Sequence, residues 1–136
     1  MNLSRYSAEL QSVLRIVVGL LFMSFGAMLL FAFPAAPPGA PGPMPLTSQM
    51  GVGGILEFVG GLLLVAGFWT RTTSFVLSGM MAVAYFQFHM MKGGFWPSTN
   101  GGANAALFCF VCLYFAAVGA GPWSVDAMMD KKAKLG

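Results

Sequence analysis

Four long apolar runs decide what this chain can fold into. They cover residues 12–33, 52–69, 73–91 and 103–120, and almost no charge interrupts them. Each run has the roughly 17–25 residues that a helix needs to cross a bilayer core. Their hydrophobicity is continuous, without the period of two that strands of a membrane barrel show. The sequence therefore predicts an all-α fold, a bundle of four transmembrane helices that forms one domain over residues 1–136.

Composition also favours a membrane protein over a soluble one. Hydrophobic residues make up 57% of the chain and charged residues 8%, whereas about a quarter of the residues in soluble domains are charged. The lipid bilayer is therefore the first partner that we expect. The net charge of +3 is small and lies mostly in a basic tail over residues 127–136, so no nucleic-acid interface is indicated.

The three connections between the runs differ in character. Residues 34–50 contain most of the chain's eight prolines and no charge, a composition that favours extended chain over helix. Residues 70–72 are short enough for a tight hairpin. Residues 92–102 combine turn residues with Trp96, an aromatic residue of the kind that anchors proteins at the membrane interface.

Basic residues are distributed unevenly between the two ends of the predicted bundle. All but Lys92 fall at one end: Arg5, Arg15, Arg71, Lys131, Lys132 and Lys134. Cytoplasmic loops of membrane proteins carry an excess of Lys and Arg. We therefore predict that both termini and the 70–72 hairpin are cytoplasmic, and that the proline-rich loop 34–50 faces outward.

Glu57 is the one acidic residue inside the apolar runs. A charged side chain at membrane depth costs about 2.5–3.5 kcal/mol on insertion scales, so it normally faces a protein interior or a wet cavity. Gly53, Gly60 and Gly61 share a helix stripe with Glu57, and small residues mark places where membrane helices approach closely. We therefore expect Glu57 to point into the bundle, towards a partner.

Other polar and aromatic side chains fall at the same predicted depth as Glu57. They are Tyr85, His89 and Lys92 in the third run, Trp96 in the following loop and Asn104 at the start of the fourth run. Two interpretations remain open. In the first, Glu57 pairs with Lys92 or His89 and fixes the helix register. In the second, these residues hold a quinone-like head group or relay protons.

Metal and haem sites have less support in the sequence. One His and one carboxylate fall short of the three or four protein ligands that zinc requires, so no metal site is predicted. Haem ligation by His89 stays open, although the chain has no second histidine. Cys109 and Cys112 have C-x-x-C spacing but lack the context of a redox or haem-attachment motif. We therefore expect no intrinsic cofactor, with a quinone as the candidate ligand.

A second stripe begins at Arg15 in the first run. Arg15, Gly19, Phe22 and Gly26 fall on one helix face, and the glycines predict close helix contact there. Asp126 follows the fourth run at the same predicted level. We therefore predict a structural Arg15–Asp126 ion pair that closes the cytoplasmic end of the bundle.

Several motifs follow one another in a recognisable order. They are Arg15-x-x-x-Gly19-x-x-Phe22-x-x-x-Gly26, Gly54-x-x-Glu57-x-x-Gly60-Gly61, Gly67-x-x-Thr70-Arg71, Asn100-Gly101-Gly102 and Gly119-x-Gly121-Pro122-Trp123-Ser124-x-Asp126. From Leu14 to Asp126, their order and spacing resemble the DoxX family. The resemblance implies a four-helix bundle in the cytoplasmic membrane of a bacterium or archaeon.

The resemblance also implies a connection with membrane redox chemistry. The family takes its name from the small membrane subunit of a thiosulfate:quinone oxidoreductase, and other members are linked to redox-stress membrane complexes. Two departures argue against a direct thiosulfate-oxidising role. Many members have a Glu where this chain has Asn104, and often a Lys near the positions of Leu29 and Leu30, where an anionic substrate would need basic contacts.

Two classes of function remain. In the first, the protein is an accessory or quinone-interacting component of a membrane redox complex. In the second, it is a structural subunit that docks other membrane subunits, or a second copy of itself, through its apolar faces and the proline-rich loop. A stand-alone enzyme is not expected, because the chain has no motif for flavin, haem or an iron–sulfur cluster.

Overall fold

The computed structural model describes residues 2–136 and is all-helical over them, without a strand. The predicted all-α class is thus confirmed. The chain divides into two compact units. Unit 1 comprises the residues up to Thr70 and those from Ala120 onwards, and unit 2 comprises Arg71–Gly119.

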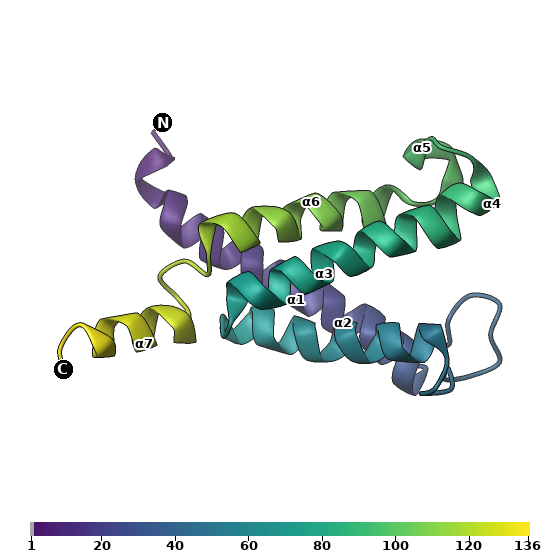
Figure 1. Ribbon diagram of the computed structural model, residues 1–136, viewed down its shortest axis with the longest axis horizontal. Coiled ribbons are helices and arrows are strands. Elements are labelled where there is room, and N and C mark those ends of the chain that lie inside the picture. Colours follow the sequence, from purple (N-terminus) through teal and green to yellow (C-terminus); the bar gives the residue numbers. More distant parts are fainter. Residues whose placement is uncertain (1) are drawn as a thin grey trace. The chain divides into compact units, whose positions relative to one another are not determined.

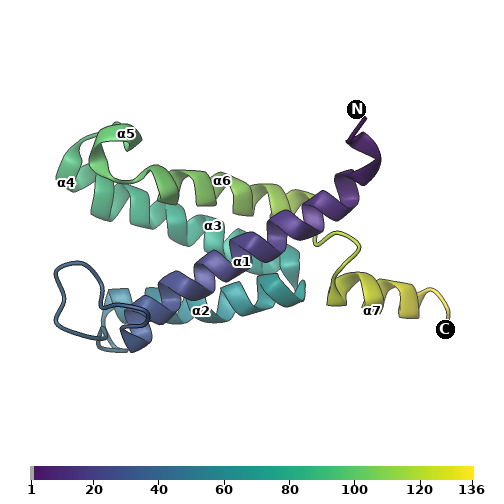
Figure 2. The ribbon, with the colours of Figure 1, turned by 180° about the vertical axis from the view of Figure 1, so that it is seen from behind.

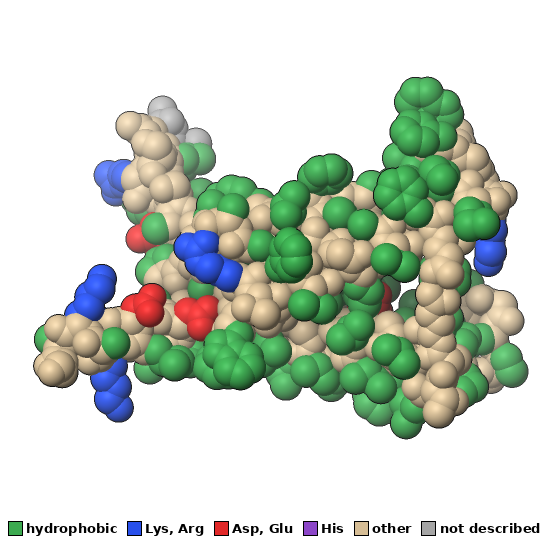
Figure 3. Space-filling model, in the orientation of Figure 1, with side chains coloured by type: hydrophobic (Ala, Val, Ile, Leu, Met, Phe, Trp, Pro, Cys, Tyr) green, Lys and Arg blue, Asp and Glu red, His purple; other side chains and the backbone are tan. Residues whose placement is uncertain are grey.

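Three helical stretches in the described chain are long and apolar enough to cross a membrane. They are Ser4–Phe31, Gln49–Ala66 and Thr70–Gly93. A further apolar helix, Ala103–Val118, is shorter. Hydrophobic side chains cover much of the helix surface that Figure 3 shows, as contact with lipid requires. The protein therefore has transmembrane helices, while a count of four spans and the cytoplasmic placement of the termini stay predictions.

Unit 1 is built on two antiparallel helices that lie side by side, α1 (Ser7–Phe31) and α2 (Gln49–Ala66) (Figures 1 and 2). A short 3₁₀ turn, Ser4–Tyr6, precedes α1. The predicted stripe of α1 is confirmed, because its four members are all buried and its glycines approach α2. A Cβ atom added to Gly19 would lie 2.8 Å from the Gly61 carbonyl oxygen.

The stripe predicted for α2 was wrong by one residue at its outer member. A Cβ atom added to Gly54 would lie 2.9 Å from Leu29, whereas one added to Gly53 would meet no atom within 4 Å. Gly61 does contact α1 as expected. Neighbouring residues point about 100° apart around a helix, so a shift of one residue places Gly53 beside the α1 contact and not in it.

The proline-rich connection is non-helical, as predicted, up to Ser48. It folds back on the end of α1, where the Met44 N–H donates to the Leu29 carbonyl at 2.8 Å. The Ser48 side chain caps α2 by accepting a hydrogen bond from the Gly51 N–H at 3.0 Å. The predicted loop 34–50 is therefore too long by two residues, because this cap starts the helix at Gln49.

The predicted hairpin at residues 70–72 was also wrong. Helix α2 ends at Ala66 because Gly67 adopts a left-handed conformation (φ 68°), which favours glycine. The turn spans residues 67–69, and Thr70 already begins α3 (Thr70–Ala84).

Unit 2 contains most of α3 and the antiparallel helix α6 (Ala103–Val118), which lie side by side (Figures 1 and 2). Ser78 links them by donating from Oγ to the Cys109 carbonyl at 2.7 Å. Helix α3 continues without a break through a π-helix, η2 (Tyr85–Met90), into α4 (Met91–Gly93). We call residues 91–102, which include α4 and the short helix α5 (Pro97–Asn100), the elbow.

The basic tail is helical, which the sequence did not predict. Helix α7 covers Val125–Ala133 and belongs to unit 1. The Ser124 side chain caps it by accepting a hydrogen bond from the Ala127 N–H at 3.1 Å. Serine followed by an acidic residue in the first turn is a recognisable start signal, and here it identifies the helix that was missed.

Candidate functional site

Arg15 lies fully buried in unit 1 and binds main-chain oxygens. Its Nε donates to the Ala120 carbonyl at 2.8 Å and its Nη2 to the Trp123 carbonyl at 2.5 Å. Its Nη1 donates to the carbonyls of Leu64 and Val65, the latter at 2.9 Å. A buried charge is tolerated when its donors are satisfied. Arg15 therefore ties α1 to the end of α2 and to the segment that follows α6.

Glycines leave room for this guanidinium and its neighbours. A Cβ atom on Gly67 would lie 2.7 Å from Arg15 Nη1, and one on Gly121 would lie 2.5 Å from Ser12 Oγ. Ser12 is buried, and its hydroxyl accepts a hydrogen bond from the Trp123 N–H at 3.2 Å. These two motif glycines are therefore explained by packing.

Asp126 also serves the main chain of unit 1. Its two carboxylate oxygens accept hydrogen bonds from the N–H groups of Trp69 and Thr70, each at 2.9 Å. The Asp126 N–H in turn donates to the Gly67 carbonyl at 2.9 Å. Arg15 and Asp126 thus both form hydrogen bonds with main-chain groups of unit 1, around the turn that follows α2. A direct ion pair between them stays a prediction.

The Asn100-Gly101-Gly102 motif fastens the elbow to η2 within unit 2. The Asn100 side-chain amide donates to the Gly94 carbonyl at 2.8 Å and to the Tyr85 hydroxyl at 3.3 Å, and it accepts from the Gly102 N–H at 2.7 Å. Gly101 has a left-handed backbone (φ 75°). A Cβ atom on Gly102 would lie 2.8 Å from Tyr85 and from His89. We call this arrangement the Asn100 clamp.

Tyr85 and His89, two predicted site residues, belong to the clamp. The buried Tyr85 donates its hydroxyl to the Phe95 carbonyl. Nδ1 of the half-buried His89 lies 3.3 Å from the Asn100 carbonyl oxygen. The structure therefore brings Tyr85 and His89 together around Asn100, which the prediction did not include among the site residues. The motif itself was the signal for Asn100, because glycines after an Asn indicate a tight turn.

Lys92, Trp96 and Asn104 are exposed in unit 2. Lys92 Nζ lies 5.9 Å from the centre of the Phe88 ring. The Trp96 ring packs edge-on against Phe95 at 5.6 Å between centroids. Asn104 lies in the first turn of α6. A role of these three side chains in ligand binding stays a prediction.

Glu57 lies in unit 1, on α2, whereas the other predicted ligand residues lie in unit 2. Its Oε2 atom is buried and has no hydrogen-bond partner among the described residues. A buried acceptor without a partner is costly and is rare in folded proteins. Glu57 is therefore a candidate ligand group, and its convergence with Tyr85, His89 or Lys92 stays a prediction.

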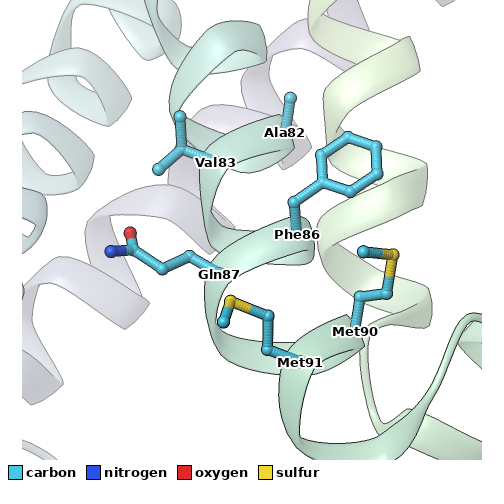
Figure 4. A pocket seen from close by; sticks show the side chains of 6 residues that line it. All are labelled: Ala82, Val83, Phe86, Gln87, Met90 and Met91. Carbon is cyan, nitrogen blue, oxygen red and sulfur yellow. The ribbon is translucent and has the colours of Figure 1, made fainter.

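A recess of about 440 Å³ lies along η2 (Figure 4). Its lining comes from one continuous helix in two rows with i, i+4 spacing: Ala82, Phe86 and Met90, and Val83, Gln87 and Met91. We call it the η2 groove. Gln87 is its one polar side chain, and the recess is widely open at the helix surface. The sequence prediction missed this groove, because its residues read as an ordinary apolar helix surface.

Comparison with known proteins assigns the family. Residues 10–90 match the model of the DoxX family. The chain is 39% identical over 137 residues to an uncharacterized protein of Haemophilus influenzae, covering 96% of this chain and 98% of that protein. It is 32% identical over 84 residues to the inner membrane protein YqjF of Escherichia coli, covering 57% of this chain and 59% of YqjF. No solved structure matches. This chain therefore belongs to the DoxX family of membrane proteins.

Proposed function

We propose that this protein is an accessory subunit of a membrane redox complex in the bacterial cytoplasmic membrane, and that its η2 groove binds a quinone. The groove carries the proposal. It lies in a candidate membrane span, where a lipophilic ligand is available, and it is apolar except for one amide. π-Helical turns often occur at functional sites.

The chemistry of the groove suits a quinone. The aromatic ring of Phe86 and the flexible thioethers of Met90 and Met91 offer a soft apolar surface for a ring and its tail. The Gln87 side chain carries the donor that a quinone carbonyl accepts. The Asn100 clamp contacts Tyr85 and His89, two residues of the same π-helix η2.

An accessory role fits the use of the motif residues. Arg15, Asn100 and Asp126 bind main-chain groups, and Arg71 donates to the carbonyls of Ala116 and Ala117 at the end of α6. Each of these polar side chains is already hydrogen-bonded to the main chain and stabilises the scaffold. Electron transfer to or from a bound quinone would therefore rely on a redox cofactor of a partner subunit.

The test is photolabelling in nanodiscs with a photoreactive short-chain ubiquinone analogue. We expect the label on peptides from residues 82–91, displaced by unlabelled decyl-ubiquinone. Met90→Trp fills the groove and should weaken labelling about tenfold, equivalent to about 1.4 kcal/mol. Val76→Trp places the same side chain at an exposed position of α3 outside the groove and should have no effect. Label elsewhere, or equal loss in both variants, contradicts the quinone site.

A purely structural role is the alternative, and the proline-rich connection favours it. Phe33 and Leu46 are exposed there, outside the helices. In this case the connection and the apolar helix faces dock a larger complex or a second copy. Replacing residues 37–45 with a short Gly-Ser linker should then dissociate the assembly seen on native gels, while quinone labelling is absent from the unaltered protein. The quinone proposal expects labelling to persist in the shortened protein.

A further inference from the structure

The elbow has a surface that is unusual for a loop in water. Met91, Phe95 and Trp96 are 77%, 63% and 69% exposed. Hydrophobic side chains gather over the α4–α5 corner in the space-filling view, with a basic side chain beside them (Figure 3). The elbow begins in the last three residues of the candidate span Thr70–Gly93 and continues beyond its end.

Three carbonyls in the middle of the elbow are satisfied from within the protein. Three successive carbonyls accept hydrogen bonds: Gly94 from the Asn100 amide at 2.8 Å, Phe95 from the Tyr85 hydroxyl, and Trp96 from the N–H groups of Thr99 and Asn100, both at 3.1 Å. Water satisfies such groups in an ordinary surface loop. Irregular backbone at membrane depth requires protein partners, because lipid offers none.

We propose that the elbow is inserted into the boundary between lipid headgroups and acyl chains, and that Lys92 binds the phosphate of an anionic lipid there. Exposed aromatic side chains beside carbonyls that are already bonded within the protein fit a partly dehydrated layer. Trp is enriched at this depth because its ring is apolar and its N–H can still donate. Lys92 supplies the complementary charge for a phosphate, and its ammonium lies close to the Phe88 ring.

This inference stands apart from the quinone proposal, although the two sites are neighbours. Met91 lines the η2 groove and is also the first residue of the elbow. The inserted elbow therefore places one end of the groove at the lipid headgroups. A ligand would then enter the groove from the bilayer.

Depth-dependent quenching of Trp96 fluorescence tests the insertion. Trp69→Phe and Trp123→Phe leave Trp96 as the one tryptophan, and the full chain is placed in nanodiscs of phosphatidylcholine with or without phosphatidylglycerol. We expect strong quenching by 5-doxyl lipid, weak quenching by 12-doxyl lipid and little by aqueous iodide. Iodide quenching as strong as that of free N-acetyltryptophanamide, with no effect of doxyl lipid, overturns the proposal.

Asn100→Ala tests whether the Asn100 clamp holds the elbow in the boundary between headgroups and acyl chains. It should raise iodide quenching of Trp96 about threefold, because the freed Gly94 carbonyl and the lost link to the Tyr85 hydroxyl draw the loop into water, while circular dichroism keeps its helical signal. Unchanged quenching means that the satisfied backbone does not hold the elbow in the boundary, and this overturns the argument.

The phosphate contact has its own test. Native mass spectrometry counts the phosphatidylglycerol molecules that stay bound. Lys92→Gln should lower their retention about fivefold, since a basic residue near an anionic surface contributes about 1 kcal/mol. Lys134→Gln makes the same charge change at an exposed residue beyond α7 and should have little effect. Equal losses in the two variants identify non-specific attraction and overturn the Lys92 site.

Discussion

In unit 1 a buried guanidinium satisfies main-chain groups at the turn after α2, whereas in the elbow of unit 2 an amide, a phenol and an imidazole do so. Both regions join helices where the regular hydrogen bonding of the helix stops. Arg15 brings up to five donors in one rigid group, and its charge makes each hydrogen bond stronger. The elbow distributes the same task over neutral side chains. We therefore expect the region around Arg15 to be rigid and the elbow to open locally at a smaller cost in free energy.

The largest expected effect follows from removing the charge in unit 1. Arg15→Met should lower the free energy of unfolding by about 3–5 kcal/mol, because the carbonyls of Val65 and Ala120 lose their donor and the Leu64 carbonyl keeps only the Gly67 N–H. Thermal unfolding in mild detergent measures the loss. Arg5→Met at the exposed start of the chain is the control. Similar melting temperatures of Arg15→Met and Arg5→Met would contradict the expectation that the region around Arg15 is more strongly held than the elbow.

The close approach of α1 and α2 gives the next effect. A Cβ atom on Gly26 would lie 2.5 Å from the Phe58 main-chain nitrogen, so Gly26→Ala should separate the helices and cost about 1–3 kcal/mol. Gly53→Ala, on the open side of α2, should be neutral or slightly stabilising. The same melting experiment compares them. A neutral Gly26→Ala would show that α1 and α2 are less tightly packed than described.

The elbow should respond more mildly. Asn100→Ala removes three hydrogen bonds around partly buried groups and should cost about 1–2 kcal/mol. Hydrogen exchange should rise at the amide of Gly102 while the amides of α1 stay protected. Asn104→Ala, at an exposed position, should change neither the free energy of unfolding nor the exchange at Gly102. A loss as large as that of Arg15→Met would mean that neutral and charged anchors are equivalent here.

Glu57→Gln should have the smallest effect on stability. The buried Oε2 atom has no hydrogen-bond partner among the described residues, so the isosteric amide breaks no hydrogen bond at this atom and should change the free energy of unfolding by less than about 1 kcal/mol. Melting and quinone labelling are measured together. A large loss of stability supports the register-pair interpretation, whereas lost labelling with intact stability supports a ligand role.

Much of the fold follows from hydrophobic runs and special residues. The α1 stripe from Arg15 to Gly26 is predictable, because a long helix with two small residues and one charge on one face has few ways to bury them. The family motifs also mark real structural positions. Asn100 and Asp126 both sit where a helix begins or a turn closes.

The errors cluster where one residue of register matters. Gly53 was expected at the α1 contact that Gly54 makes, and the hairpin was expected three residues late. Composition hardly changes over such shifts, yet each step turns a side chain by about 100°. Asn100 was not named as a site residue, because depth along a helix says little about which turn residue reaches back.

The sequence by itself determined that this is an all-helical membrane protein, because long apolar runs must satisfy their backbone polar groups in helices within lipid. It also determined that Arg15 and Glu57 need special surroundings, because charge at membrane depth is costly. Only the tertiary structure decided which groups satisfy Arg15, how Asn100 fastens the elbow, and that η2 forms a groove. The Arg15 contacts join residues far apart in the chain, so no local pattern predicts them, and the clamp and the groove depend on side-chain geometry that composition does not specify.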